Sequence, residues 1–348
     1  MLQLAGAGVH AAAPPLDKLS RPLRDLRISV TDRCNFRCPY CMPQEVFGPG
    51  YKFLPRAAIL SYEEIARLAR IFAALGVVKI RLTGGEPLLR RDLETLIVRL
   101  AATEGIKDLS LTTNGSLLDS AKAGALKAAG LGRVTVSLDA LDQPTFTAMS
   151  NSELPVARVL DAIAAAAAAG LAPVKVNMVV RRGMNEADIV PLAERFRHSG
   201  VIVRFIEYMD VGQSNGWRLD DVVPASSILA QLGSRWPLEP VPPRHPGEVA
   251  QAWRYRDGAG EIGIIASVTQ PFCGGCNRAR LSSDGKLFTC LFATAGLDLR
   301  ALLRAGADDG AITAAIHGTW TRRVDRYSEL RAHATGKRAK IEMSYIGG

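Results

Sequence analysis

The chain alternates short apolar runs with helix-forming stretches six times in succession, and this alternation is the strongest constraint on its fold. A strand, a helix and a further strand in series predict a parallel sheet with right-handed crossovers. Periodicity leaves open whether the sheet stays open or curls, and six units are about two fewer than a closed β/α barrel contains. The expected strands cover residues 27–30, 78–83, 108–112, 133–138, 174–180 and 201–208.

Helices are expected between these strands, at residues 65–75, 92–102, 119–129, 156–169 and 185–198. Ser61 and Glu64 have the spacing of a capping box ahead of the first helix, and Gly76 suits its C-terminal end.

The alternation stops after about residue 232. A proline-rich stretch at 237–246 predicts a linker or a long loop, and Ser-Asp-Gly-Lys at 283–286 predicts a hairpin turn. A strand-like run (261–268) lies between them, and two short helices (297–304 and 308–317) follow. We therefore predict a flexible N-terminal extension (1–22), a sheet domain (23–235) and a C-terminal α+β region (236–348).

Three cysteines, Cys34, Cys38 and Cys41, lie in one short segment with the spacing C-x3-C-x2-C. Three thiolates suit a [4Fe–4S] cube in which one iron has no protein ligand, whereas an electron carrier normally has protein sulfur at all four positions. The open iron predicts a cluster that binds an external molecule and does chemistry on it.

The remaining cysteines, Cys273, Cys276 and Cys290, form a second set with the spacing C-x2-C-x13-C. A disulfide framework fits poorly, because the chain is long and shows no secretory signal. Structural zinc is the stronger alternative, but zinc sites usually close with four Cys or His ligands, and neither set has a histidine in ligand spacing. We therefore predict iron–sulfur clusters and a reducing, cytoplasmic location.

The composition is that of a globular protein, with 48% hydrophobic and 22% charged residues. No apolar run reaches the roughly 18 residues that span a bilayer. The net charge of +9 suits nucleic acid or a small polyanion such as a nucleoside triphosphate, and it does not by itself decide between them. Because no long lysine or arginine block occurs, we predict neither a nucleic-acid nor a membrane partner.

The first cysteine segment resembles the signature of the radical S-adenosylmethionine superfamily, C-x3-C-x-aromatic-C, with Tyr40 as the aromatic residue. Residues 83–87, Thr-Gly-Gly-Glu-Pro, resemble its GGEP element. The resemblance implies a partial (β/α)6 TIM-like barrel in which the open iron binds S-adenosylmethionine and a 5′-deoxyadenosyl radical is released. It implies that Cys34, Cys38 and Cys41 are catalytic. The implied cofactor contacts are Tyr40, Gly85, Ser137 and Met209.

A narrower resemblance is to the GTP 3′,8-cyclase family of molybdenum cofactor biosynthesis. It rests on residues 273–280 with Cys290, on residues 112–115 and 175–177, and on the terminal Gly347-Gly348. The match runs from about residue 23 to the end of the chain. It implies a second [4Fe–4S] cluster on Cys273, Cys276 and Cys290 that anchors the guanine of GTP, and terminal glycines that reach into the active site.

The implied reaction removes hydrogen from C3′ of GTP, after which C3′ attacks C8 of guanine. The product is (8S)-3′,8-cyclo-7,8-dihydroguanosine 5′-triphosphate, formed in the first step of molybdenum cofactor biosynthesis. Cyclic pyranopterin monophosphate synthase is the implied downstream enzyme. A reductant protein for the cluster and a homodimer are further expectations from this resemblance.

Several cations should converge on the triphosphate of GTP, because Arg and Lys form strong charge-assisted hydrogen bonds with phosphate. Arg27 and Arg81 lie within predicted parallel strands, which are generally buried on both faces. A polar cavity lined by these strands would resolve that conflict. The expected GTP contacts are Arg27, Arg81, Thr112, Lys175, Arg278 and Arg280.

Two other interpretations remain open. A radical enzyme could modify a peptide or RNA and use the second cube as an electron relay; comparing GTP with other substrates for 5′-deoxyadenosine formation would separate it. A zinc-stabilised nucleic-acid-binding module would be colourless and would bind nucleic acid with a steep salt dependence.

Overall fold

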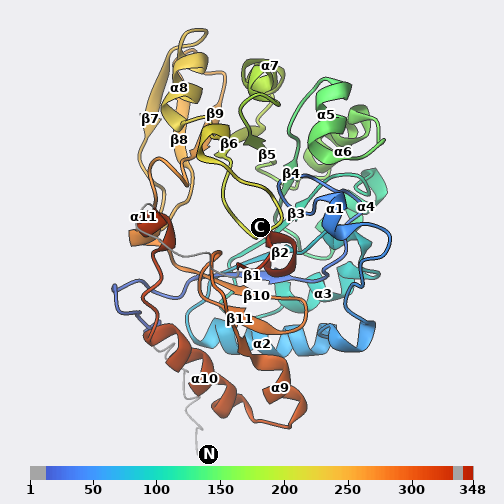
Figure 1. The fold of residues 1–348 in the computed structure, drawn as a ribbon. Helices are drawn as coiled ribbons and strands as arrows, with labels where there is room; N and C mark the ends of the chain where they lie inside the picture. The colour runs from blue at the N-terminus through green and yellow to red at the C-terminus, as the bar shows by residue number, and fades with distance from the viewer. Residues whose placement is uncertain (1–12, 332–339, 348) are drawn as a thin grey trace, which may run out of the picture.

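The computed structural model describes residues 13–331 and 340–347, and within them it contains one 12-stranded sheet. Six parallel strands form the middle of this sheet in chain order (Figure 1). Each overlaps a strand predicted from the sequence. Their bounds are Asp25–Ser29 (β1), Lys79–Thr83 (β2), Asp108–Thr113 (β3), Arg133–Ser137 (β4), Lys175–Val180 (β5) and Ile202–Glu207 (β6).

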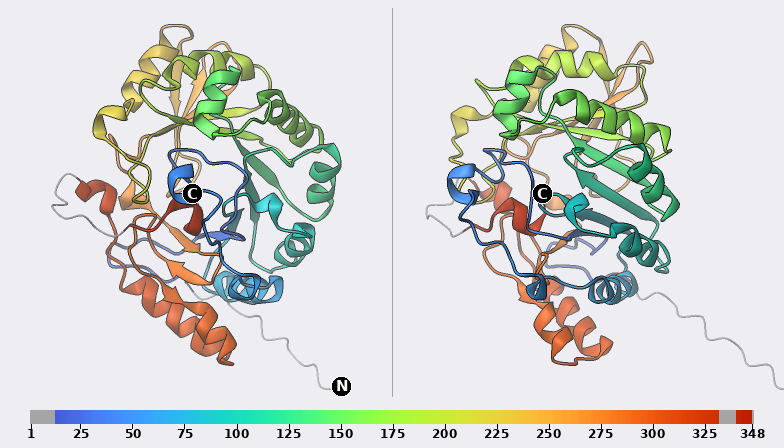
Figure 2. Two further views of the ribbon diagram at one scale, coloured as in Figure 1. Left: turned by 45° about the vertical axis from the view of Figure 1, so that its right-hand side comes forward. Right: turned by 90° about the vertical axis from the view of Figure 1, so that its right-hand side faces the viewer.

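Long helices follow these strands and lie around the outside of the curved sheet (Figure 2), whereas the short helix at Gln44–Phe47 belongs to the loop between β1 and β2. The predicted capping box starts the first long helix, because Glu64 N donates to Ser61 Oγ at 3.1 Å and Ser61 N donates to Glu64 Oε2 at 2.7 Å. The helices of this part are Gln44–Phe47 (α1), Tyr62–Ala74 (α2), Leu93–Ala101 (α3), Ser120–Ala128 (α4), Gln143–Ser150 (α5), Val156–Ala168 (α6) and Ile189–Phe196 (α7).

The C-terminal part of the chain extends one edge of the sheet. Strand β10 (Arg278–Leu281) pairs in parallel with β1, and β11 (Lys286–Phe288) and β12 (Leu297–Asp298) continue it antiparallel. The predicted hairpin turn is confirmed, since Ser282 N donates to Lys286 O at 2.9 Å and Gly285 has a φ of +83°. The later helices are Ala225–Gly233 (α8), Leu299–Arg304 (α9), Asp309–Thr321 (α10), Tyr327–Leu330 (α11) and Met343–Ile346 (α12).

The other edge of the sheet corrects one prediction. Strand β9 (Glu261–Ile265) pairs in parallel with β6, and β8 (Gln251–Tyr255) follows antiparallel. The outermost strand, β7 (Leu238–Val241), lies inside the proline-rich stretch that was predicted to be a linker or loop. Proline lacks an N–H, and β7 tolerates Pro240 because an edge strand has a neighbour on one side only.

The two edge strands, β12 and β7, are not hydrogen-bonded to each other within the described residues, so the curled sheet is an incomplete barrel. This confirms the predicted partial barrel with a C-terminal α+β region. Short 3-10 turns complete the elements: Arg56–Ala58 (η1), Pro87–Leu89 (η2), Glu186–Asp188 (η3), Leu219–Asp221 (η4) and Cys273–Gly275 (η5). None of the helices described has the length and apolar character of a membrane span.

Alternation along the strands separates an apolar outer face from a polar inner face. On β1, Leu26 and Ile28 belong to the hydrophobic core, and Arg27 between them takes the opposite face. On β2, Ile80 and Leu82 flank Arg81 in the same way. Each buried leucine or isoleucine contributes about 1.5–3 kcal/mol, so the outer face stabilises the scaffold while the inner face carries charge.

The segment ahead of β1 is packed against the rest of the protein from about residue 14. Leu16 forms a β-bridge with Pro22, and the side chains of Asp17 and Arg21 are buried. The flexible extension predicted over residues 1–22 therefore differs from the structure at 13–22, while residues 1–12 lie outside the described residues. Strands from both sides of residue 235 belong to one sheet, and a shared sheet does not mark a domain boundary. The division at residue 235 therefore stays a prediction.

Candidate active site

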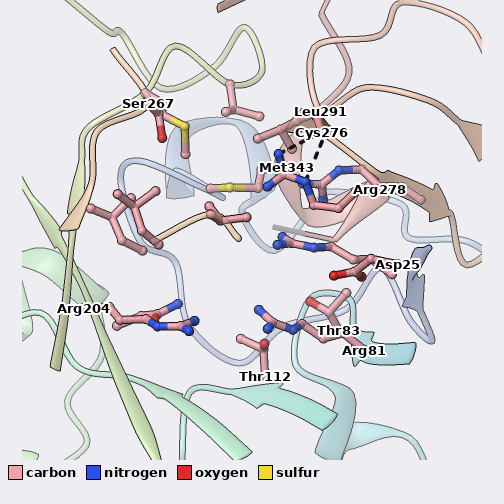
Figure 3. Close-up of a pocket in the computed structure, with 18 of the residues that line it drawn as sticks. Asp25, Arg81, Thr83, Thr112, Arg204, Ser267, Cys276, Arg278, Leu291 and Met343 are labelled. Atoms are coloured by element: carbon pink, nitrogen blue, oxygen red, sulfur yellow. Dashed lines mark hydrogen bonds between the residues drawn. The ribbon is translucent and has the colours of Figure 1, made fainter. Parts of the chain in front are cut away.

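A cavity of about 940 Å³ lies on the inner side of the curved sheet, and strands β1 to β6, β10 and several loops line it. Every residue that the sequence analysis assigned to a cluster, to the cofactor or to the substrate is part of this lining. Figure 3 shows a close-up of this cavity, with Arg81 and Thr112 on one side and Arg204 facing them. One site therefore collects residues from both ends of the chain, from Ser20 to Met343.

The first cysteine set lies in the loop after β1. Cys41 N and Met42 N both donate to Cys38 O at 2.9 Å, which folds the loop tightly, and Phe36 N donates to Cys34 Sγ at 3.4 Å. Burial raises the pKa of Cys34 to about 11 and raises the pKa values of Cys38 and Cys41 as well. Buried thiols of this kind are neutral on their own, and a bound metal would deprotonate them.

The Gly-Gly-Glu-Pro turn after β2 is held directly against this loop. Gly85 N donates to Thr31 O at 2.8 Å, and Glu86 N donates to Arg33 O at 2.8 Å. A Cβ atom at Gly85 would lie 2.1 Å from Arg33 O, so only glycine permits this approach. The glycine therefore sets the separation between the turn and the cysteine loop.

Two buried carboxylates support this region, and the sequence analysis identified neither. Glu86 accepts hydrogen bonds from Thr113 Oγ1 at 2.8 Å and Asn114 N at 2.7 Å, and burial raises its pKa to about 7. Asp139 accepts from Tyr40 OH at 2.7 Å, and burial raises its pKa to about 6. Asp139 thus fixes the aromatic ring of the cysteine loop. The predicted cofactor contacts Ser137 and Met209 also line the cavity.

The second cysteine set brackets strands β10 and β11, with two cysteines before β10 and one after β11. Cys276 N donates to Cys273 O at 3.1 Å, and Phe292 N donates to Cys290 Sγ at 3.4 Å. The sulfur of Cys276 accepts hydrogen bonds from Arg278 Nη2 and from Arg323 Nη2, each at 3.2 Å. Burial acts to raise the pKa of Cys276, but the two guanidiniums together lower it to about 6.

Both cysteine sets fit an iron–sulfur cluster in donor chemistry, since each supplies three thiols and backbone N–H donors to sulfur. In the described part of the chain, no three His, Cys, Asp or Glu side chains lie as close together as the ligands of one metal ion do. The assignment of these cysteines to clusters therefore stays a proposal.

Three arginines form a row across the floor of the cavity. In the sheet register Arg27 of β1 stands beside Arg81 of β2 on one side and beside Arg280 of β10 on the other. Burial and the neighbouring charges of Arg280 and Arg81 lower the pKa of Arg27, and burial lowers the pKa of Arg280 to about 10. Nε of Arg27 and Arg81 are buried and have no hydrogen-bond partner among the described residues.

The facing wall adds two more cations, Lys175 on β5 and Arg204 on β6. Burial, followed by the charge of Arg204, lowers the pKa of Lys175 to about 6, and burial lowers the pKa of Arg204 to about 9. Across the described residues, neither of these side chains nor Arg27, Arg81 or Arg280 forms a salt bridge (Asp and Glu partners within 4.0 Å). This excess of buried positive charge is suited to a polyanion.

Arg204 was missed by the sequence analysis, although it carries the signal that identified Arg27 and Arg81. It too is a charged residue inside a parallel strand, between the core residues Val203 and Phe205. Thr112, a predicted contact, lines the cavity with a buried hydroxyl that has no hydrogen-bond partner in the described part of the chain. Asn177 Oδ1 is unpartnered in the same way.

The C-terminal tail reaches the floor of the cavity. Arg280 donates a hydrogen bond to Gly347 O, and a Cβ atom at Gly347 would lie 2.3 Å from Thr83 Cγ2. The last described helix, α12, lies within the curve of the sheet in the left view of Figure 2. Gly348, the second terminal glycine of the sequence, lies outside the described residues.

Comparison with known families divides the chain into two matched regions. Residues 28–196 match the Radical SAM superfamily, and residues 201–329 match the family described as Molybdenum Cofactor Synthesis C. The GTP 3′,8-cyclase of Acidothermus cellulolyticus is 55% identical, over 96% of this chain and 99% of that protein. The chain belongs to the GTP 3′,8-cyclase family.

Further family members extend this similarity. The GTP 3′,8-cyclases of Xanthomonas axonopodis and Staphylococcus aureus are 50% and 48% identical, over 97% and 95% of this chain and 99% and 98% of their own lengths. Streptococcus suis SuiB bound to S-adenosylmethionine has a TM-score of 0.59 at 15% identity, over 94% of this chain and 76% of its own. At this identity the likeness to SuiB concerns the fold.

A glycine substitution tests the close approach of the Gly-Gly-Glu-Pro turn. We expect Gly85→Ala to displace the cysteine loop, at a cost of about 1–3 kcal/mol from overpacking, and to lower iron retention. Urea unfolding and iron analysis of the reconstituted protein would measure both effects. Gly50→Ala is the matched control, because a Cβ atom there meets nothing within 4 Å. Equal stability and equal iron content in Gly85→Ala and Gly50→Ala would contradict this account of Gly85.

Proposed function

We propose that the protein converts GTP to (8S)-3′,8-cyclo-7,8-dihydroguanosine 5′-triphosphate, the first step of molybdenum cofactor biosynthesis. The observation that carries this proposal is that two three-cysteine sets face one cavity together with five cations that form no salt bridge with any described residue. Membership of the GTP 3′,8-cyclase family supports it. A peptide or RNA substrate has less support, because a concentrated group of buried cations matches a triphosphate better than an extended chain.

In this proposal Cys34, Cys38 and Cys41 hold one [4Fe–4S] cluster, and S-adenosylmethionine occupies its open iron. The cluster and cofactor together supply a 5′-deoxyadenosyl radical that removes hydrogen from C3′ of GTP. The chain orients the cofactor through the backbone at Gly85 and through Tyr40, which Asp139 holds in place. Ser137 and Met209 complete the cofactor side of the cavity.

The substrate side of the proposed site has two parts. Cys273, Cys276 and Cys290 hold a second [4Fe–4S] cluster that receives the guanine of GTP. The proposed triphosphate contacts are the cations of the row and of its facing wall, together with Thr112 and Arg278: Arg27, Arg81, Thr112, Lys175, Arg204, Arg278 and Arg280. Arg278 also contacts the sulfur of Cys276, so it joins the two parts.

The proposed reaction needs other proteins. A reductant must supply electrons to the first cluster, and a cyclic pyranopterin monophosphate synthase would take the cyclised product onward. We also propose a homodimer and a cytoplasmic location, the latter because clusters with an open iron are stable only in a reducing compartment.

Iron content and cofactor cleavage test the proposal directly. Anaerobically reconstituted protein should hold about eight irons, four for each cluster, and should release 5′-deoxyadenosine from S-adenosylmethionine when dithionite and GTP are present. About four irons would remove the second cluster from the proposal. A colourless zinc protein, or 5′-deoxyadenosine formation that depends on a peptide or RNA and not on GTP, would contradict the proposed function.

Arg81 tests the triphosphate site. Removing its charge by Arg81→Ala should weaken GTP binding roughly 10- to 150-fold, because each charge-assisted hydrogen bond contributes about 1.5–3 kcal/mol. Isothermal calorimetry would measure the dissociation constant. Arg99→Ala is the control, since Arg99 forms an exposed ion pair with Glu63 on the outer helices. Unchanged affinity in Arg81→Ala would exclude this residue from the site.

Lys175 makes GTP binding depend on pH. Its pKa of about 6 in the free site should rise when a triphosphate lies beside it. The contribution of Lys175 to GTP affinity is therefore fully present below its pKa in the free protein. That contribution is lost as pH rises through its higher pKa in the GTP complex. At about pH 8, where phosphate is already ionised, binding should take up close to one proton.

Calorimetry in buffers of different ionisation enthalpy measures that proton uptake. Lys175→Met should bind GTP more weakly and should take up fewer protons than the unmodified chain. Lys127→Met is the control, because Lys127 lies on the exposed side of α4 and donates to Gly170 O at 2.7 Å. Equal proton uptake in the unmodified chain and Lys175→Met would contradict this role of Lys175.

A further inference from the structure

A buried ion cluster lies behind the second cysteine loop and has no part in the proposed GTP or cofactor contacts. Asp17 Oδ2 is 2.6 Å from Arg21 Nε and 3.1 Å from Arg323 Nη1. The side chains of Asp17, Arg21 and Arg323 are 0%, 2% and 1% exposed. Burying three charges costs several kcal/mol for each ion before pairing, so this arrangement calls for a functional explanation.

The two arginines hold the two ends of the short turn that carries the first two cysteines of the second set. Arg21 Nη1 donates to Cys273 O at 2.8 Å and to Asp325 O at 2.7 Å. Arg323 Nη1 donates to Cys276 O at 2.7 Å, and its Nη2 donates to Cys276 Sγ at 3.2 Å. Asp17 connects the arginines, so the three residues act on the turn as one unit.

Helix α10 anchors this unit to the body of the protein. Trp320, near the end of α10, is buried, and its Nε1 donates to Arg21 O at 3.0 Å. The guanidinium carbon of Arg323 lies 4.6 Å from the centre of the Trp320 ring. The orientation of both arginines is therefore set by packing as well as by charge.

The three buried side chains of this unit carry an excess of positive charge next to the sulfur of Cys276. One carboxylate against two guanidiniums leaves one positive charge among the three buried side chains. Asp325 offers little compensation, because its nearest oxygen is 3.6 Å from Arg323 Nε and its side chain is 33% exposed. The sulfur of Cys276 also accepts from Arg323, and a negative charge on it would be shared between Arg323 and Arg278.

We propose that Asp17, Arg21 and Arg323 form a clamp that shapes the Cys273–Cys276 turn for the second cluster and raises the reduction potential of that cluster. A hydrogen bond and a positive charge at a ligand sulfur favour the more negative, reduced cluster. The inference rests on the second cluster of the proposed function. It makes the segment ahead of β1 a positioning element for the site, rather than a loose extension.

Substitutions at Arg323 test the clamp. We expect Arg323→Gln to lower the midpoint potential of the second cluster, or to reduce the iron content from about eight towards about four per chain, and to leave the first cluster unchanged. Arg323→Lys keeps the charge but loses the forked contact. The midpoint potential of its second cluster should therefore lie between the values for Arg323→Gln and the unmodified chain. Asp17→Asn removes the negative charge that lies between the two arginines, so it should shift the midpoint potential in the opposite direction, upwards.

The measurement is a redox titration of each reconstituted protein, followed by electron paramagnetic resonance, together with iron analysis. Arg322→Gln is the matched control, since Arg322 is the neighbouring residue but is exposed. An intact signal from the first cluster, with S-adenosylmethionine bound, shows that a variant is folded. If Arg323→Gln does not fold, Arg323→Lys and Asp17→Asn take its place.

The possible outcomes separate this inference from the proposed function. Eight irons in the unmodified chain, with the same iron content and second-cluster potential in the folded clamp variants, would overturn the clamp alone. About four irons in the unmodified chain would overturn the second cluster and the clamp with it. A selective change at the second cluster in the clamp variants, absent from Arg322→Gln, would support the clamp.

Discussion

The site depends on the alternation of side chains along the parallel strands. An inward residue on β1 or β2 is flanked by two outward residues, and the outward residues form the core beneath the helices. Arg27 and Arg81 can therefore be charged and buried at once, because their neighbours supply the apolar packing. A shift of one residue in either strand would exchange the two faces and would abolish the core and the site together.

The second constraint is the curl of the sheet, which brings distant parts of the chain to one cavity. Strand β10 comes more than two hundred residues after β1 in the chain, yet the two are paired in parallel, and this pairing sets Arg280 beside Arg27. The turn before β10 and the loop after β11 carry the second cysteine set. The two sets therefore face one cavity because a C-terminal strand adds to the N-terminal edge of the barrel.

The sequence predicts those features that depend on local pattern, and it misses those that depend on long-range contact. The parallel strands, the capping box at Ser61 and the hairpin turn have short-range signals and are confirmed. Strand β7 was missed because prolines normally indicate a loop, and only its edge position makes Pro240 acceptable. The clamp residues Asp17 and Arg323 are separated by 306 positions, so no local pattern indicates that they meet.

The cavity has an electrostatic cost in the absence of a ligand, and this cost explains how it can be selective. Loss of hydration on burial, followed by repulsion among the cations, lowers the pKa values of Lys175, Arg204 and Arg280. A bound polyanion offsets the repulsion among the cations, and the electrostatic free energy gained in this way adds to its binding free energy. A neutral ligand cannot provide this contribution. The hydrophobic core on the outer face offsets the cost in the empty protein. The inner face of the strands thus carries the cations suited to an anion, and the outer face supplies the apolar packing that stabilises the charged site.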